Sequence, residues 1–340
     1  MRLTAKLRRS LAVPATAGLT ALLIAAVAAP ASADTSNVRN TAFQANTGHL
    51  FIYYPSNNSH TDTGLGVAAG TSPSYAGSTS SGLAVAFQAD TGHLWFYTAT
   101  NAGHRDTGLG MAAGTSPSMV PVTIGFEMAF QADTGHLWTR FTSNNSNFDT
   151  GLGMAAGTSP SVATILNVNE VAFQANTGHL WIHDYQSTTT NLDTGLGMAA
   201  GTSPSISDSS AGTAVAFHAN NGHLWIWTAT NAGNRDTGLG MAAGTSPSIS
   251  EDSSGNLVVA FHADTGHLWF YTATNAGHRD TGLGMAGGTS PSIEPANATN
   301  DFGISFQADT GHLWIRDTAS NTNRDSGLGM AAGTSPSTLF

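Results

Sequence analysis

Apolar residues recur along this chain in short runs that glycine-rich polar segments separate. A run of the Val-Ala-Phe type comes shortly before one that begins Gly-His-Leu-Trp, and a later Asp-Thr-Gly segment leads to Ser-Pro-Ser and another apolar residue. Runs of this length between turn residues are typical of β-strands, and helical periodicity is absent after residue 33. The pattern predicts an all-β protein.

The whole pattern occurs seven times. The tripeptide Gly-His-Leu begins at spacings of 43 to 45 residues, at Gly48, Gly92, Gly135, Gly178, Gly222, Gly266 and Gly311. A period of about 44 residues with four strand signals is typical of a β-propeller blade. A β-solenoid is the main alternative, but its repeat is usually shorter and it needs terminal caps, which the sequence does not show.

Each repeat predicts four short strands. The first follows the proline, as at residues 247–249, and the second is an apolar run such as residues 215–217. The third is the His-Leu-Trp segment, as at residues 223–227, and the fourth lies near residues 235–237. The Ala-Asp/Asn-Thr-Gly segment between the second and third strands predicts a tight hairpin whose glycine has a positive φ.

The two ends of the repeated region complement each other. Residues 38–43 begin at a second strand, and residues 335–340 end just past a first strand. The last residues therefore supply the strand that the first blade lacks, which leaves no open sheet edge. We predict a closed, seven-bladed β-propeller.

The first 33 residues have a different composition. Arg2, Lys6, Arg8 and Arg9 precede a mostly apolar stretch over residues 19–29, and Ala31-Ser32-Ala33 follows. This order predicts a secretory signal peptide over residues 1–33, a single propeller domain over residues 34–340 and an extracellular location. The alternative is an N-terminal membrane anchor, for which the apolar run is short.

Charge and cysteine content limit the partners. The chain has 11 basic and 21 acidic residues and a net charge of −10, and four of the basic residues lie in the first 33 positions, which leaves −14 for the remainder. Nucleic acids and anionic lipids need basic surfaces, so neither is predicted as a partner. Cysteine is absent, so stability must come from a large core.

The order Pro-Ser-Ile, Val-Ala-Phe-Gln and Gly-His-Leu-Trp, followed by a glycine-rich link, resembles bacterial seven-bladed propeller lectins of the Photorhabdus type. It is more loosely similar to tectonin-type propellers, and the Thr-Gly-Leu-Gly-Met-Ala-Ala-Gly-Thr-Ser-Pro-Ser-Ile text resembles tandem repeats of secreted actinobacterial proteins. The resemblance covers residues 34–340. It implies the propeller fold and carbohydrate binding in shallow sites repeated around the ring.

The repeated aromatic and histidine positions have two interpretations each. A tryptophan provides a platform for a sugar ring or a wedge between blades, at Trp95, Trp225, Trp269 and Trp314 among others. A histidine lines a polar site or pairs with a repeated aspartate in a buried network, at His93, His223 and His267 among others. Zinc is not expected, because its ligands must converge at one point, and no other cofactor is predicted.

Two positions vary between repeats. The position two after the tryptophan lies on the same strand face and is predicted to be partly exposed, at Tyr53, Tyr97, Arg140, His183, Trp227, Tyr271 and Arg316. The loop before the repeated aspartate carries side chains suited to sugar hydroxyls, at Asn101, Asn231, Asn275, Arg105, Arg235 and Arg279. The alternatives are an ordinary blade edge and a solvated loop.

Enzyme motifs are not found. Asp-Thr-Gly recurs in nearly every repeat, so it indicates turn chemistry, and the four glutamates (Glu127, Glu170, Glu251 and Glu294) lie at unmatched positions. A glycosidase needs two carboxylates held close together. We therefore expect a secreted, multivalent glycan-binding lectin without enzymatic activity. The alternative is a protein-interaction scaffold or the recognition subunit of a secreted assembly.

Overall fold

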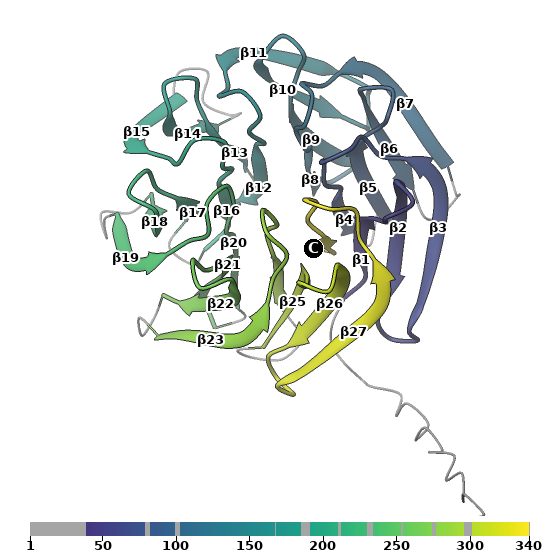
Figure 1. The fold of residues 1–340 in the computed structure, drawn as a ribbon. Helices are drawn as coiled ribbons and strands as arrows, with labels where there is room; N and C mark the ends of the chain where they lie inside the picture. Colours follow the sequence, from purple (N-terminus) through teal and green to yellow (C-terminus); the bar gives the residue numbers. More distant parts are fainter. Residues whose placement is uncertain are drawn as a thin grey trace, which may run out of the picture. The chain divides into compact units, whose positions relative to one another are not determined.

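The computed structural model describes residues 39–78, 82–98, 103–166, 168–184, 191–209, 212–229, 234–252, 254–273, 277–295 and 301–339. The predicted signal peptide and the candidates Asn101, Asn231 and Asn275 lie outside these residues. The described residues form seven four-stranded antiparallel sheets and contain no helix. Residues 35–340 belong to one compact unit, a seven-bladed β-propeller (Figure 1).

Each blade holds one sheet, and its four strands lie side by side in order from the propeller axis to the rim. Blade 1 contains β28 (Ser337–Thr338), β1 (Thr41–Gln44), β2 (His49–Tyr54) and β3 (Ser59–Gly66); blade 2 contains β4 (Ser74–Ser78), β5 (Gly82–Gln88), β6 (His93–Thr98) and β7 (Gly103–Gly110); blade 3 contains β8 (Ser118–Pro121), β9 (Phe126–Gln131), β10 (His136–Phe141) and β11 (Asn147–Gly153). Blade 4 contains β12 (Ser161–Ile165), β13 (Val168–Gln174), β14 (His179–Asp184) and β15 (Asn191–Gly197); blade 5 contains β16 (Ser205–Ser207), β17 (Ala214–His218), β18 (His223–Thr228) and β19 (Arg235–Gly240). Blade 6 contains β20 (Ser248–Glu251), β21 (Leu257–His262), β22 (His267–Thr272) and β23 (Gly277–Gly284), and blade 7 contains β24 (Ser292–Pro295), β25 (Phe302–Gln307), β26 (His312–Asp317) and β27 (Thr322–Gly329).

The antiparallel order sorts the connections onto two faces of the propeller. The hairpins between second and third strands lie on one face, together with the segments that lead from each fourth strand to the next blade. We call this the hairpin face. The loops between first and second strands and between third and fourth strands lie on the other side, which we call the loop face. The predicted hairpin glycines have positive φ, as at Gly48 (φ 83°) and Gly92 (φ 81°).

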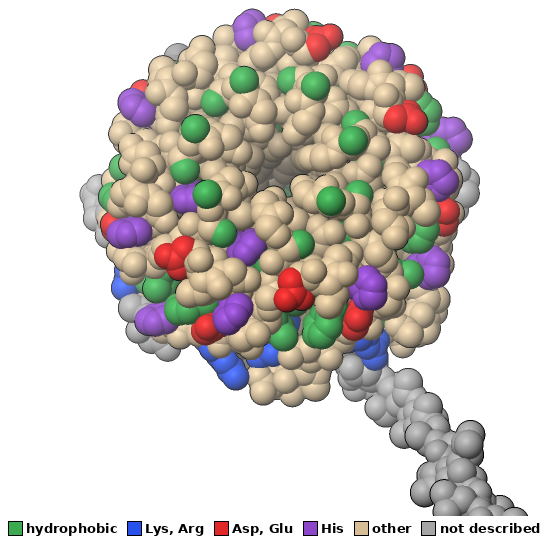
Figure 2. All heavy atoms as spheres, viewed as in Figure 1, with side chains coloured by type: hydrophobic (Ala, Val, Ile, Leu, Met, Phe, Trp, Pro, Cys, Tyr) green, Lys and Arg blue, Asp and Glu red, His purple; other side chains and the backbone are tan. Residues whose placement is uncertain are grey.

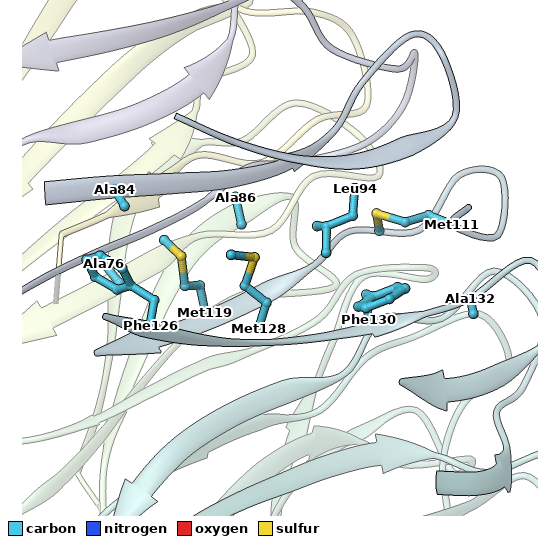
Figure 3. Packing of buried hydrophobic residues seen from close by; sticks show 10 residues of the cluster. All are labelled: Ala76, Ala84, Ala86, Leu94, Met111, Met119, Phe126, Met128, Phe130 and Ala132. Carbon is cyan, nitrogen blue, oxygen red and sulfur yellow. The ribbon is translucent and has the colours of Figure 1, made fainter. Parts of the chain in front are cut away.

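The hydrophobic core is divided among the contacts between neighbouring blades. Between blades 2 and 3, Ala84 and Leu94 from one sheet pack against Met128 and Phe130 from the other (Figure 3). The phenylalanine of the Val-Ala-Phe run is fully buried in every blade, at Phe43, Phe87, Phe130, Phe173, Phe217, Phe261 and Phe306. Full burial of one such side chain contributes about 1.5–3 kcal/mol. Both faces of each sheet are therefore covered by its neighbours.

Two closed rings of hydrogen bonds surround the axis. In the first, each serine of the inner strands accepts a backbone N–H from the next blade, as Ser74 Oγ does from Met119 at 2.9 Å; its members are Ser74, Ser118, Ser161, Ser205, Ser248, Ser292 and Ser337. In the second, the backbone N–H of each serine before the proline donates to the equivalent hydroxyl of the next blade; its members are Ser72, Ser116, Ser159, Ser203, Ser246, Ser290 and Ser335. The donors point in opposite senses around the two rings. The repeated Ser-Pro-Ser thus ties every blade to both neighbours.

The predicted closure of the propeller is confirmed. Strand β28 pairs with β1, with Thr41 opposite Thr338 and Ala42 opposite Ser337. Both serine rings close at the same place, where Ser335 N–H donates to Ser72 Oγ and Tyr75 N–H donates to Ser337 Oγ. The last residues of the chain complete the first blade, as their sequence predicts.

Candidate functional site

The seven repeated histidines pair with the seven repeated aspartates. Each Nδ1 lies 3.0–3.1 Å from an aspartate Oδ1, as in His93 and Asp106. The same Oδ1 of Asp106 accepts the N–H of Gly108 at 2.8 Å. Partial burial acts to raise the pKa of Asp106, but the hydrogen bonds from Gly108 and His93 outweigh it and lower the pKa below its usual value.

These pairs lie at the surface. Each histidine side chain is 39–40% exposed, so the expectation of a buried network is wrong, although the pairing itself is confirmed. Histidines are spread around the rim of one face in Figure 2, which also shows the hollow at the axis. That hollow is a cavity of about 490 Å³, and the seven serines of the first hydrogen-bonded ring are part of its lining.

The repeated tryptophans are half-buried and pack between blades. Trp95 of blade 2 contacts the cluster that holds Leu50 and Val67 of blade 1, and it lies tilted against Phe87. His104 stacks on Trp95 with centroids 5.6 Å apart, and Trp269 has the same contact with His278. The wedge interpretation therefore describes the packing, and in these two blades an imidazole already occupies one face of the ring.

The variable position on the third strand is more buried than its sequence suggests. Tyr53, Arg140, Tyr271 and Arg316 are only 1–4% exposed, so the prediction of a partly exposed position is wrong for these four. Tyr97, His183 and Trp227 are partly exposed, as predicted. The reason is that this strand face turns towards the preceding blade, which covers its end.

The polar groups at four of these positions have neutral partners, whereas the buried hydroxyl of Tyr271 has no hydrogen-bond partner among the described residues. Tyr53 donates to Asn58 Oδ1 at 2.7 Å, and His183 Nδ1 lies 2.7 Å from Asn191 Oδ1. Arg140 donates to the Oδ1 atoms of Asn145 and Asn147, and Arg316 does the same to Asn321 and Asn323. Burial lowers the pKa of both guanidinium groups, and the nearby arginines Arg105 and Arg279 lower it further.

The predicted loop arginines reach from one blade to the next. Arg235 of blade 5 donates to the carbonyl of Ala273 at 3.2 Å and lies 5.6 Å from the ring centroid of Tyr271 in blade 6, a cation–π contact. Arg279 of blade 6 donates to Asn321 Oδ1 of blade 7 at 3.1 Å. We call each such contact region a blade junction and number it by its two blades.

One arginine of this kind was missing from the candidates. Arg324 of blade 7 donates to the carbonyl of Pro55 in blade 1 at 2.6 Å. The sequence alone could have identified Arg324, because it directly precedes the repeated aspartate Asp325, as Arg105 precedes Asp106. At the same position blades 1, 3 and 4 carry Thr61, Phe148 and Leu192. Arginines of this register therefore occur at four junctions, 2/3, 5/6, 6/7 and 7/1.

The 6/7 junction also contains a cavity of about 200 Å³. Arg279, Thr272 and Phe270 line it from blade 6, and Phe302 and Thr318 line it from blade 7. Only Arg279 among these residues was predicted. The equivalents of Phe270 and Phe302 in other blades, such as Ile226 and Phe126, are core residues, so these positions gave no sign of a site. The cavity thus combines a guanidinium, a hydroxyl and aromatic edges, which are groups that bind a polar ring compound.

Two of the four glutamates accept hydrogen bonds from a neighbouring blade. Glu127 and Glu170 occupy the same register on β9 and β13, so the expectation of unmatched positions is wrong for this pair. Each accepts a hydrogen bond from the following blade, from Asn169 and from Thr213 respectively. Burial raises the pKa of Glu170, and the hydrogen bond from Thr213 opposes this shift. The described residues contain no group of three or more His, Cys, Asp or Glu side chains placed to hold a metal ion.

Comparison with known proteins gives structural neighbours only. No family model and no curated protein matches this chain. The SapL1 lectin in complex with alpha methyl fucoside has a TM-score of 0.56 at 12% identity, and the match covers 79% of this chain and 98% of that one. The fucose-specific lectin from Aleuria aurantia has a TM-score of 0.53 at 13% identity, covering 76% and 95%.

A triple arginine-to-alanine mutant of AofleA from Arthrobotrys oligospora has a TM-score of 0.53 at 12% identity, covering 78% of this chain and 88% of that one. The chain shares the propeller fold of these lectins. The Aleuria aurantia lectin has six blades, whereas this chain has seven. In the part of the chain that the structure describes, no helix is long and apolar enough to cross a membrane.

Proposed function

We propose that this protein is a secreted, multivalent carbohydrate-binding lectin that uses its blade junctions near the loop face. The observation that carries the proposal is the 6/7 junction. There Arg279 meets Arg316 across Asn321, Trp314 packs in the same interface, and Arg279 also lines a cavity of about 200 Å³. A pocket with apolar walls and a few fixed donors is the usual form of a sugar site.

The structural neighbours support this chemistry. SapL1 is described in complex with alpha methyl fucoside, and the Aleuria aurantia lectin is described as fucose-specific. At 12–13% sequence identity the comparison supports a shared fold only. The kind of sugar that this chain binds therefore has to be inferred from its own junction residues. The predicted signal peptide over residues 1–33 supports secretion, and the lack of an enzyme motif in the sequence supports a binding role.

Repetition has a physical use in such a protein. A single shallow sugar site binds with a dissociation constant of about 1 mM, which is about −4 kcal/mol. Several junctions on one rigid propeller raise the avidity for a glycan-dense surface by roughly 10² to 10⁴. Four of the seven junctions carry an arginine at the register of Arg279, so we expect four of them to contribute most of the binding.

A glycan array tests the proposal, with two variants of the 5/6 junction as matched probes. Arg235→Thr copies the residue that blade 1 carries. It should weaken array binding while lowering the free energy of unfolding by only about 0.5–1 kcal/mol, because Arg235 is exposed and its contact with Tyr271 is a cation–π pair. Trp269→Ala should lower the free energy of unfolding by about 2–4 kcal/mol, because this side chain packs between blades. Absence of binding to every immobilised glycan would contradict the proposal.

The second candidate function, a protein-interaction scaffold, is favoured by one observation. The exposed large apolar residues of the described chain are Ile124, Phe148, Leu166 and Leu192, at 45–74% exposure, and all four lie on blades 3 and 4. Exposed apolar groups gathered on one side are typical of protein contacts. Pull-down with a Phe148→Ser, Leu192→Ser variant as control distinguishes this function, because a glycan site at the 6/7 junction does not depend on these residues.

A further inference from the structure

Two guanidinium groups converge at the 6/7 junction without a carboxylate between them. Arg279 Nη2 and Arg316 Nη2 donate to the same atom, Asn321 Oδ1, at 3.1 and 2.6 Å. One amide oxygen thus holds two positive side chains that come from different blades. Like charges in contact repel, so this arrangement is stable only at a cost unless an anion joins it.

The donors of this pair greatly outnumber their acceptors. Each guanidinium has five N–H donors. Arg316 uses two of them, on Asn321 and Asn323, and its Nε is buried without a hydrogen-bond partner among the described residues. Arg316 is only 4% exposed, whereas Arg279 beside it is exposed, so an acceptor for the free donors of Arg316 has to enter the junction next to Arg279. A buried planar donor group of this kind matches the two oxygens of a carboxylate or sulfate.

Among the described residues, the nearest acidic side chains form no ion pair with either arginine, although the charge of Asp317 acts to raise the pKa of Arg316 against the larger effects of burial and Arg279. Asp252 lines the cavity, but its carboxylate accepts the backbone N–H groups of Ser254 and Asn256, both at 2.8 Å. Asp317 follows Arg316 and accepts the N–H of Ala319 at 2.9 Å. Neither carboxylate forms an ion pair with Arg279 or Arg316 in the described residues. Both aspartates are held by their own turns.

The 2/3 junction carries arginines at the same two positions, and Arg105 lies near enough to lower the pKa of Arg140. Arg105 of blade 2 occupies the position of Arg279. Arg140 of blade 3 occupies that of Arg316 and donates to the two equivalent asparagines, Asn145 and Asn147. Arg140 is 3% exposed, and its Nε is likewise buried without a partner among the described residues. The other five junctions have no second arginine, because blades 1, 2, 4, 5 and 6 carry tyrosine, histidine or tryptophan at the position of Arg316.

We propose that the 6/7 and 2/3 junctions bind acidic saccharides, with the arginine pair holding a uronate carboxylate or a sulfate ester. This inference rests on the proposed function and specifies the class of sugar. At the 6/7 junction, the adjoining cavity of about 200 Å³ receives the sugar ring against Phe270 and Thr272. The remaining surface is acidic, so binding depends on the paired donors rather than on overall charge.

Isothermal titration calorimetry with trigalacturonate tests the inference, with a neutral galactose trisaccharide as the comparison ligand. The wild-type protein should bind two trigalacturonate molecules. Arg279→Thr should leave one site, and Arg279→Thr combined with Arg105→Thr should leave none. Arg279→Lys keeps the charge but loses the planar fork, so it should weaken its site at least about tenfold.

Gly287→Asp is the charge-matched control. It changes the net charge by the same amount as Arg279→Thr, and Gly287 is exposed on the hairpin face with open space at its Cβ position. Stoichiometry and affinity should therefore match the wild type. Equal weakening by Gly287→Asp would overturn the inference in favour of diffuse electrostatics. Neutral glycan binding without trigalacturonate binding would overturn the inference alone, whereas absence of both would overturn the proposed function as well.

Discussion

Two blades replace a buried glutamine with histidine. In five blades the residue after the Val-Ala-Phe phenylalanine is glutamine, whose Nε2 donates to a backbone carbonyl of the following link, as Gln88 does to Met111. In blades 5 and 6 His218 and His262 take this place and lie 3.1 Å from the carbonyls of Thr245 and Thr289. A carbonyl accepts only, so Nδ1 carries the proton and donates in both.

These histidines should make the fold sensitive to mild acid. Burial lowers the pKa of His218 and His262 below the usual 6.5, and their hydrogen bonds to carbonyls oppose the shift only in part. Between their lowered pKa in the folded state and 6.5, these histidines bind more protons in the unfolded chain. Their contribution to stability is therefore full above pH 6.5 and falls as the pH drops below it, whereas the raised pKa values of Glu170 and Glu294 act in the opposite sense. His218→Gln with His262→Gln should flatten this dependence.

The urea midpoint measured from pH 8 to pH 5 checks this prediction. At pH 8 the double variant should unfold at about the wild-type midpoint, because glutamine fills the same place in five blades. An equally steep loss of stability in both proteins would contradict it. The surface aspartates act in a separate range, because their lowered pKa values affect stability only as the pH falls below 3.8.

The links between blades show which glycines the fold requires. Six of the seven links read Ala-Ala-Gly, and the link before blade 7 reads Ala-Gly-Gly at Ala286, Gly287 and Gly288. Gly288 has φ +74°, a left-handed conformation, whereas Gly287 does not and has open space at its Cβ position. The fold therefore requires a glycine at position 288, whereas position 287 accepts a residue with a side chain.

Alanine at these two positions should have opposite effects. Gly287→Ala should stabilise the protein by about 0.4–1 kcal/mol, because it restricts the unfolded chain without strain in the folded one. Gly288→Ala should destabilise it by about 1–2 kcal/mol, because the fold forces this position into the left-handed conformation, which is unfavourable for alanine. Urea unfolding of both variants at pH 7 gives the comparison, and a shift of the same sign in both would refute the argument.

At the scale of the element, most of the fold could be read from the repeat. The four strands per period and the hairpin glycines follow from local turn residues and apolar runs, and both are confirmed in blades such as β16–β19. The permuted ends are confirmed in blade 1, where β28 pairs with β1. The serine rings were not predicted. Their hydroxyls pair with backbone groups about 43–46 residues away or across the chain ends, and no local pattern reports such a partner.

The whole molecule depends on the contact between its first and last strands. Strand β28 covers the inner edge of β1, Ser337 Oγ closes the first serine ring, and Leu339 N–H donates to the carbonyl of Asn40. Without this strand, β1 is an uncovered edge at the axis, with unpaired backbone groups. Closure therefore joins both ends of the chain into one cooperative unit.

Deletion of residues 336–340 should lower the free energy of unfolding by on the order of 3 kcal/mol or more, because several hydrogen bonds and the cover of β1 are lost together. Ser337→Ala removes a single ring bond and should cost only about 0.5–1.5 kcal/mol. Tryptophan fluorescence during urea unfolding measures both. If the truncated protein unfolds at the wild-type midpoint, the propeller does not depend on this closure.

The sequence by itself determined the architecture of this protein, because blade number, strand order and ring closure follow from local signals repeated seven times. It also pointed to the repeated histidines, tryptophans and loop arginines as the chemistry of the surface. Only the tertiary structure decided which of these side chains meet. The burial of Arg140 and Arg316, and the convergence of Arg279 with Arg316 on Asn321, arise between neighbouring sheets. Such contacts depend on how two blades pack, and a pattern within one repeat carries no information about what lies across the junction.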